Sequence, residues 1–148
     1  MAVNPEYLGR VYLPSGPYAV DAAMIADFAA TVGATDPVHP DPQVARAAGY
    51  PDVIAPPTMA VRFQQLNARE YVADPEAGID YARVVHGEQS FVHHRPIHAG
   101  DVLTGVLTVD SIRSAGGHAM VTTRSELTDA DGGPVATVVS TIVVRGGE

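Results

Sequence analysis

The sequence contains no cysteine and no lysine, and its nine basic residues are all arginines. Without cysteine, the chain cannot form disulfides, thiolate nucleophiles or cysteine-ligated metal sites. Without lysine, it cannot use a Schiff base or a lysine general base. It also lacks an apolar run approaching the ~20 residues that span a bilayer, and a basic-then-apolar signal pattern at its N-terminus. We therefore expect a cytoplasmic protein with no membrane partner.

A surplus of positive charge is absent as well, because the formal net charge is −8 at pH 7. Nucleic-acid binding needs a basic patch that faces the phosphates, so we expect no nucleic-acid partner. An anionic partner, such as an acyl carrier protein or the phosphates of coenzyme A, would need a local cluster of arginines to overcome the unfavourable long-range field.

The chain does have enough apolar sequence for a core, since 46% of its 148 residues are hydrophobic and only 18% are charged. A chain of this size buries roughly 70% of its unfolded surface. No repeat, linker or low-complexity segment interrupts it. We therefore expect a single domain over residues 1–148.

The first helix signal follows a turn-rich N-terminal segment. Up to about Val20 we expect coil or a short strand. Asp21 is a good N-cap for a helix over residues 22–32, with apolar side chains on one face. Gly33 is a natural residue to end that helix, because glycine accepts the left-handed conformation found there.

Prolines divide the next stretch. Residues 35–42 contain three of them and cannot form a regular helix or a central strand. A short helix is expected over residues 43–48. Pro56-Pro57-Thr58 then opens a longer helix from residue 59 to about residue 70, because proline suits the first turn of a helix.

After residue 80 the sequence becomes β-branched and alternating, which predicts strands. Gly-rich breaks that suit tight turns separate the segments. Helices followed by an antiparallel meander predict an α+β fold, in which the long helix covers one face of the sheet. This arrangement is a hot-dog fold. The expected strands are residues 83–97, 102–112, 119–127 and 135–144.

The helical spacing of the apolar residues predicts a core, and the bare edge of the sheet predicts an interface. We expect Met59, Phe63 and Leu66 to be buried against the sheet. A bare β-branched edge strand invites aggregation, so we expect a dimer in which two sheets join edge to edge. The sheet residues expected in this core are Phe91, Leu103, Leu107, Val121 and Val138.

A short motif carries the strongest functional signal. The segment Gly33-Ala34-Thr35-Asp36-Pro37-Val38-His39 resembles the signature G-D-x-N-P-[LIV]-H of the MaoC-like (R)-specific hydratases and dehydratases. Aligned on His39, the glycine, proline, valine and histidine match. Ala34 stands where the family has its catalytic Asp, and Asp36 stands where the family has Asn.

The resemblance implies how the site would work. Dehydration of a 3-hydroxyacyl thioester needs a base, an acid and a donor for the developing enolate. The family's Asp and His move the protons, and a backbone N–H at the start of the central helix is the donor. His39 and, as an alternative carboxylate, Asp36 are therefore the candidate catalytic residues, while Pro57 and Thr58 are the candidate substrate-binding residues.

Neither candidate catalytic side chain is unambiguous. Asp36 lies two residues along the loop from the family's position, and an Asx turn ahead of Pro37 is the favoured interpretation. For His39, a catalytic role and a structural hydrogen-bonded role weigh equally. Without a carboxylate partner, we expect nothing to fix the tautomer of its ring or to handle the second proton transfer.

A second polar cluster runs from Val85 to Asp101 and contains four histidines. Strand alternation would place His86 and His94 on one face with Glu88, and His93 on the other. The spacing of metal ligands is absent, so we expect no metal site. The cluster instead resembles the family's second strand, which ends in a P-[IV]-x-x-G-D turn.

The stretch from Asp41 to Thr58, D-P-x-x-A-R-A-A-G-Y followed by I-A-P-P-T, narrows the resemblance. It is similar to actinobacterial proteins related to subunits A and C of the mycobacterial (3R)-hydroxyacyl-ACP dehydratase, and to the dehydratase-like N-terminal region of fungal-type fatty-acid synthases. In such heterodimers one subunit holds the Asp and His and the other shapes the acyl channel.

Three functions follow from this resemblance. The first is the channel subunit of a (3R)-hydroxyacyl-thioester dehydratase, paired with an intact MaoC-type subunit and acting on acyl-CoA or acyl-ACP without a cofactor. The second is a self-sufficient homodimeric (R)-specific enoyl-CoA hydratase that uses His39 and Asp36. The third is a non-enzymatic module that binds acyl thioesters. The alanine at position 34 favours the first, because losing one member of an acid/base pair costs about 10²–10⁴ in rate.

Overall fold

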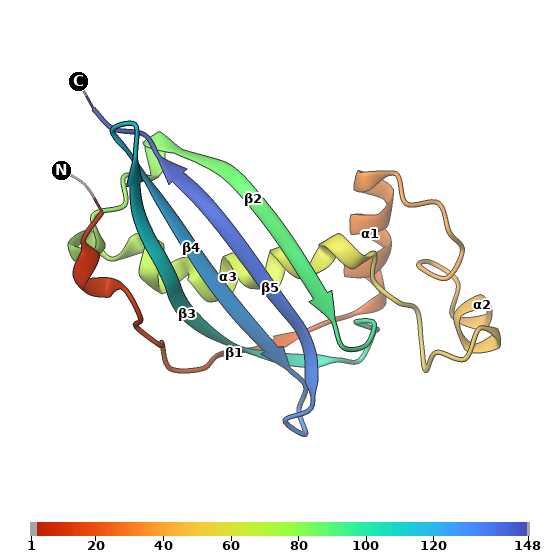
Figure 1. Ribbon diagram of the computed structural model, residues 1–148. Helices are drawn as coiled ribbons and strands as arrows, with labels where there is room; N and C mark the ends of the chain where they lie inside the picture. The colour runs from red at the N-terminus through yellow and green to blue at the C-terminus, as the bar shows by residue number, and fades with distance from the viewer. Residues whose placement is uncertain (1–2, 148) are drawn as a thin grey trace.

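The computed structural model describes residues 3–147. Its centre is a five-stranded antiparallel sheet that curves around one long helix, α3 (Ala60–Ala73), as Figure 1 shows. The strand order is β1-β3-β4-β5-β2. This is the α+β hot-dog arrangement that the sequence predicts, with the helix packed on β3, β4 and β5. The strands are β1 (Ser15–Ala19), β2 (Val84–His93), β3 (Val102–Ala115), β4 (His118–Thr128) and β5 (Pro134–Val144).

The three central strands form a meander joined by tight turns. Gly116 and Gly117 connect β3 to β4, and both have positive φ (59° and 82°). A two-residue hairpin turn with positive φ at both positions matches the twist of the strands and favours glycine. At the next turn, the Asp129 carboxylate accepts hydrogen bonds from the N–H groups of Asp131 and Gly133. The turn residues seen in the sequence therefore set the meander.

Two smaller helices lie beyond one end of the sheet (Figure 1). Helix α1 (Ala22–Val32) has the predicted bounds: the Asp21 carboxylate caps the N–H of Met24 at 2.8 Å, and Gly33 ends the helix in the left-handed conformation. Helix α2 (Pro42–Ala47) begins one residue earlier than predicted. Pro42 is compatible with a first helical turn, where its missing N–H would have no partner.

Helix α3 is preceded by a 3-10 turn, Pro57–Met59, and runs three residues beyond the predicted end at Glu70. Short 3-10 turns at the remaining connections cover Pro5–Tyr7, Pro75–Ala77 and Tyr81–Arg83. None of the helices within residues 3–147 is long and apolar enough to cross a membrane.

The core between α3 and the sheet has two apolar clusters. Met59 and Phe63 pack in the first with Leu103 and Val138, as predicted, and Phe91 is partly buried against it. The prediction that Leu107 and Val121 join them is wrong. Both lie in the second cluster, around Tyr71, because the last turn of α3 packs on a different part of the sheet from its first turns.

A polar layer separates these clusters along α3. Gln64 and Asn67 are 4% exposed, and Ser125 on β4 is fully buried. Asn67 donates from Nδ2 to the Gly105 carbonyl oxygen (3.0 Å) and to the Ser15 hydroxyl (2.7 Å). The predicted burial of Leu66 is wrong, since Leu66 is only half-buried and Asn67 takes the position that faces the sheet.

Strand β2 differs most from the sequence-based prediction. It ends at His93 rather than Ile97, because the chain turns away where Arg95 binds Asp101 and Pro96 offers no N–H. A β-bulge between His86 and Glu88 also shifts the pairing register. The extra residue moves His86 to the side that faces α3, so the predicted shared face of His86 and Glu88 is wrong.

Candidate active site

The loop from Gly33 to His39 is held by its own backbone. The N–H of Ala34 donates to the Ala29 carbonyl at 2.8 Å, and its methyl group is half-buried. Asp36 is exposed, and its Oδ1 accepts from the Val38 N–H at 3.0 Å. The Asp36 carbonyl also accepts from the His39 N–H. Asp36 therefore forms the Asx turn that the sequence favours.

His39 is 7% exposed and has one defined hydrogen bond. Its Nδ1 lies 2.6 Å from the carbonyl oxygen of Ile54. A carbonyl can only accept, so Nδ1 carries the proton and Nε2 keeps its lone pair in the neutral ring. The prediction that nothing fixes the tautomer is therefore wrong: a backbone carbonyl does so. No carboxylate among the described residues bonds or pairs with this ring.

The segment from Ile54 to Thr58 connects this loop to the central helix. The Ala55 N–H donates to the Ile97 carbonyl at 2.7 Å, and the Ala99 N–H donates to the Val53 carbonyl at 3.0 Å. These bonds join the segment to the turn that follows β2. The start of α3 is consequently fixed against the part of the sheet edge that carries the second polar cluster, residues 85–101.

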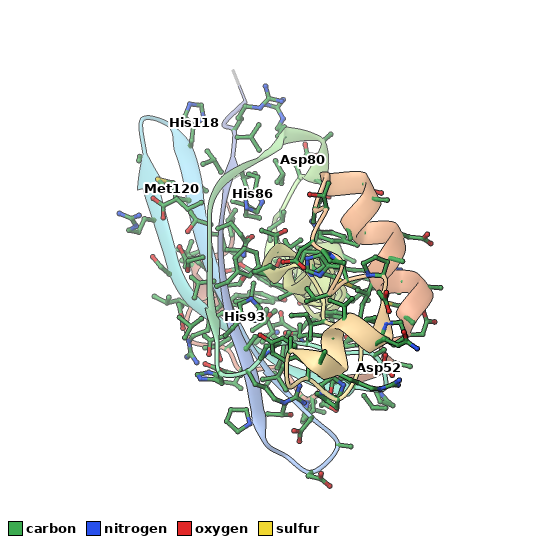
Figure 2. All side chains as sticks on the ribbon, turned by 90° about the vertical axis from the view of Figure 1, so that its right-hand side faces the viewer. Asp52, Asp80, His86, His93, His118 and Met120 are labelled. Atoms are coloured by element: carbon green, nitrogen blue, oxygen red, sulfur yellow. The ribbon has the colours of Figure 1, made fainter. Side chains whose placement is uncertain are left out.

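His93 is a second histidine that contacts the segment before α3, and the sequence analysis assigned it no role. Its Nε2 lies 2.8 Å from the Pro57 carbonyl oxygen, so Nε2 donates and Nδ1 is left as a buried acceptor without a partner among the described residues. Its ring stacks on Phe91, with the centroids 6.1 Å apart. Figure 2 looks onto the end that carries α1 and α2 and shows His93 and His86 along β2. Strand alternation puts His93 on the same face as the expected core residue Phe91, and this was the signal in the sequence that could have identified it.

Few backbone donors are free at the start of the central helix. Pro56 and Pro57 have no N–H, and the N–H of Met59 donates to the Pro56 carbonyl at 3.0 Å. The Thr58 N–H has no acceptor among the described residues. Of the two candidate substrate-binding residues, Thr58 can therefore donate a backbone hydrogen bond and Pro57 cannot.

The P-I-x-x-G-D turn is fixed by charged side chains. Arg95 binds Asp101 with two hydrogen bonds of 2.8 and 2.9 Å and reaches Asp129 at 3.2 Å. Asp101 is 6% exposed, and its Oδ2 also accepts from the His98 N–H. These contacts support the structural role predicted for the turn. No three His, Asp or Glu side chains within residues 3–147 gather in a way that could hold a metal ion.

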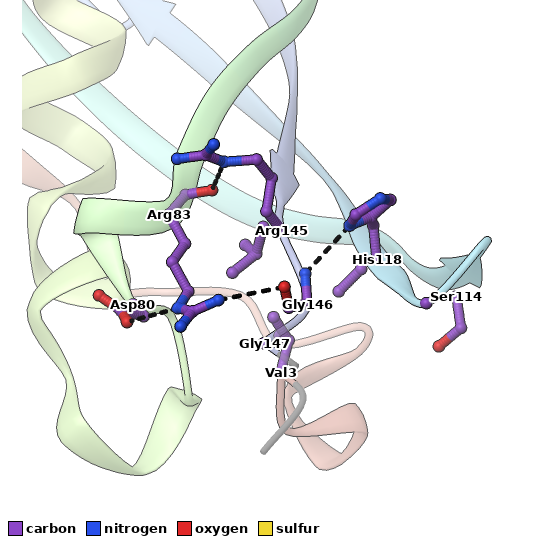
Figure 3. Close-up of a pocket in the computed structure, with 11 residues that line it drawn as sticks. Val3, Asp80, Arg83, Ser114, His118, Arg145, Gly146 and Gly147 are labelled. Carbon is purple, nitrogen blue, oxygen red and sulfur yellow. Dashed lines mark hydrogen bonds and ion pairs between the residues drawn. The ribbon is translucent and has the colours of Figure 1, made fainter.

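Two cavities lie away from His39 and Thr58. One, of about 490 Å³, is at the end of the sheet near the chain termini, where Arg83 contacts Asp80 and the Gly146 carbonyl (Figure 3). The other is a groove of about 790 Å³ between α3 and strands β2 and β5. None of the four candidate site residues lines either cavity.

The fold and the loop geometry define a hot-dog protein of the hydratase and dehydratase type. Residues 7–138 match the family model described as "FAS1-like, dehydratase domain region", and the chain belongs to this family. Its relatives include a "UPF0336 protein" of Clavibacter michiganensis, 52% identical over 99% of this chain and 98% of the relative. Another, from Leifsonia xyli, is 49% identical over the same shares.

Solved structures agree with this assignment. A "MaoC-like dehydratase" is 30% identical with a TM-score of 0.88, and the match covers 95% of this chain but 43% of that one. The HadBC (3R-hydroxyacyl-ACP dehydratase) complex from Mycobacterium tuberculosis is 24% identical with a TM-score of 0.82, over 93% of this chain and 96% of that one. The (R)-hydratase from A. caviae is 21% identical with a TM-score of 0.68, over 95% and 96%. The last two likenesses show the fold.

Proposed function

We propose that this chain is the channel-forming subunit of a two-component (3R)-hydroxyacyl-thioester dehydratase in fatty-acid metabolism. It would act in the cytoplasm as one hot-dog domain, paired with a second hot-dog subunit that carries the complete Asp and His pair. Its substrate would be an acyl group on coenzyme A or on an acyl carrier protein. Two solved neighbours are complexes: HadBC, and ChsH1-ChsH2 from Mycobacterium tuberculosis.

The observation that carries this proposal is that no carboxylate among the described residues contacts the His39 ring. Its Nδ1–H is committed to the Ile54 carbonyl, and the nearby Asp36 carboxylate is committed to the Val38 N–H. Ala34 cannot accept or release a proton. One ring nitrogen with a lone pair can take one proton, but dehydration needs a second transfer to the leaving hydroxyl.

The start of the central helix supports the same proposal. An enolate oxygen is stabilised by donors that already point at it. The consecutive prolines at 56 and 57 remove two of the N–H groups that a helix start would offer, and leave that of Thr58. The chain thus keeps the one backbone donor that the family's site needs but has only one proton-transfer group, so a partner would have to provide the second.

Strand β2 is where a second subunit would join. It is an edge strand of ten residues, and its outer side is unpaired among the described strands. Val92 is 57% exposed and Val85 is 44% exposed along it. An exposed edge of this length invites another strand, which extends the sheet across the interface. Neither cavity described above includes His39, which is consistent with a substrate chamber at His39 that forms only when a partner subunit supplies its other wall.

A self-sufficient hydratase is the second candidate, and the fixed tautomer of His39 favours it. Nε2 is free to act as a general base, and Asp36 is exposed and close in sequence. Asp36 would have to give up its bond to Val38 and turn towards the substrate. That rearrangement is why we place this function second.

Hydration of crotonyl-CoA separates these functions. We expect little turnover by the isolated chain and strong turnover when it is co-expressed with a hot-dog subunit whose G-D-x-N-P-x-H motif is intact. The double variant Ala34→Asp/Asp36→Asn restores the motif and should raise the activity of the isolated chain. Strong turnover by the unmodified chain, lost in both His39→Ala and Asp36→Ala, would establish the self-sufficient hydratase instead. Acyl-thioester binding without turnover in any combination would indicate a binding module.

A further inference from the structure

The groove beside β2 has an unusual distribution of charge. Its walls include Arg62 and Arg69 from α3 and His86 from β2, with Ser140 of β5 between them. No Asp or Glu is among the described residues that line it, although the chain has 17 acidic residues against nine arginines. The groove is therefore a basic strip on an acidic protein.

The two arginines lie on one face of the helix. They are seven residues apart, which is about two helical turns. Both are exposed, and neither forms an ion pair with another described residue. Arg46 and Arg83, which are also exposed, do have carboxylate partners, whereas the exposed Arg113 on β3 has none among the described residues. Arg62 and Arg69 thus leave two charges without a counter-charge beside the open sheet edge.

A hot-dog subunit that paired edge to edge with β2 would bring its own central helix close to this groove. The groove lies between α3 and the edge strand, so the incoming helix closes its open side. In a two-fold homodimer the same patch meets itself. Arg62 and Arg69 would then face the same two arginines of the second copy, and like charges across an interface are unfavourable.

We propose that this strip selects a different chain as partner: a hot-dog subunit whose central helix presents carboxylates to Arg62 and Arg69. The inference rests on the proposed function, because it names the chemistry of the second subunit. Leu66 and Val72 also line the groove, and a second copy of this chain or a different subunit would bury them equally. The two arginines therefore determine which of these partners binds.

The chain itself supplies the probe for this proposal. The variant Arg62→Glu/Arg69→Glu presents carboxylates on the same helix face, and mixing it with the wild-type chain makes the complementary pair. We expect the mixed dimer to form at least about tenfold more tightly than the wild-type homodimer, by sedimentation or native mass spectrometry. Raising sodium chloride from about 0.05 M to about 0.5 M should strengthen the wild-type homodimer and weaken the mixed dimer, because salt screens both interactions.

Arg113→Glu is the control for charge reversal outside the groove. Arg113 is an exposed arginine on β3, outside the groove, so its reversal should leave the mixed dimer no tighter than the homodimer. A wild-type homodimer that is equally tight at both salt concentrations, with random mixing of variant and wild type, overturns the proposal. So does the absence of any association. These outcomes do not depend on turnover, so the crotonyl-CoA assay can fail or succeed independently of them.

Discussion

The Nδ1–H of His39 donates to the carbonyl oxygen of Ile54 over 2.6 Å, which ties the motif loop to the segment that opens the central helix. His93 makes the parallel contact a few residues later, from Nε2 to the Pro57 carbonyl. The segment between α2 and α3 is thus held by two imidazole rings, His39 through its Nδ1 and His93 through its Nε2. The two rings leave opposite nitrogens unprotonated.

This contact predicts different results for two substitutions of His39. In His39→Asn, the side-chain amide can reproduce the Nδ1–H donor, whereas His39→Ala leaves the Ile54 carbonyl without its partner. We expect His39→Ala to lower the free energy of unfolding by about 1–3 kcal/mol and His39→Asn to lower it by less. Urea unfolding followed by circular dichroism measures both. Equal losses in the two variants would show that the hydrogen bond does not matter for stability.

Gly105 is predicted to be intolerant of a side chain. A Cβ at this position would lie 2.9 Å from Cγ of Asn67, which is buried and hydrogen-bonded. Because the amide cannot move without losing those bonds, Gly105→Ala should cost about 1–3 kcal/mol. Asn67→Ala removes the obstacle, so the double variant should lose less than the sum of the two single losses. Additive losses in thermal or urea unfolding would refute the clash.

Acid should destabilise the turn that joins β4 to β5. The Gly133 N–H and the Arg95 guanidinium hold the pKa of Asp129 below its ordinary value of 3.8. A carboxylate with a depressed folded pKa stabilises the protein fully above the unfolded pKa, and this contribution is lost as the pH falls through the folded pKa.

The melting temperature of the wild-type chain should therefore fall below pH 4 more steeply than that of Asp129→Asn. The asparagine can still accept from the backbone N–H groups but does not titrate. At neutral pH the variant should be the less stable of the two. Parallel melting curves across the whole acid range would contradict this assignment.

Tyr71 should be the last of its neighbours to ionise. Burial raises its pKa to about 12, and its hydroxyl has no hydrogen-bond partner among the described residues. A tyrosine in the unfolded chain ionises near pH 10. The stability that the neutral Tyr71 hydroxyl contributes is therefore complete below pH 10 and is lost as the pH rises towards 12. Tyr71→Phe removes both the titration and an unsatisfied hydroxyl, so it should unfold no more easily at pH 7 and less easily at alkaline pH.

Ultraviolet titration of the phenolates, combined with urea unfolding at pH 7 and at alkaline pH, measures this. Tyr7 stacks on Tyr71 with ring centroids 5.8 Å apart, but its hydroxyl donates to Asp74 at 2.6 Å. Tyr7→Phe is therefore the control, and it should destabilise the protein because Asp74 loses a donor. A Tyr71→Phe variant that is less stable at pH 7 than Tyr7→Phe would contradict the assignment.

Much of the fold is determined by local sequence. Asp21 and Gly33 set the ends of α1, and Gly116-Gly117 sets a hairpin, because capping and turn geometry depend on a few neighbouring atoms. The alternating strands and the motif loop were enough to predict the hot-dog fold and its family. The Asx turn at Asp36 was also predictable, since a short acidic side chain bonds its own backbone.

Only the tertiary structure decided how distant parts meet. It placed Asn67 rather than Leu66 against the sheet, because Gly105 on β3 leaves room there. It moved His86 to the groove through a bulge paired with β5, and it fixed the tautomer of His39 through Ile54. Each of these depends on contacts between residues far apart in the chain, which local propensity does not encode, whereas caps and turns are set by neighbours in sequence.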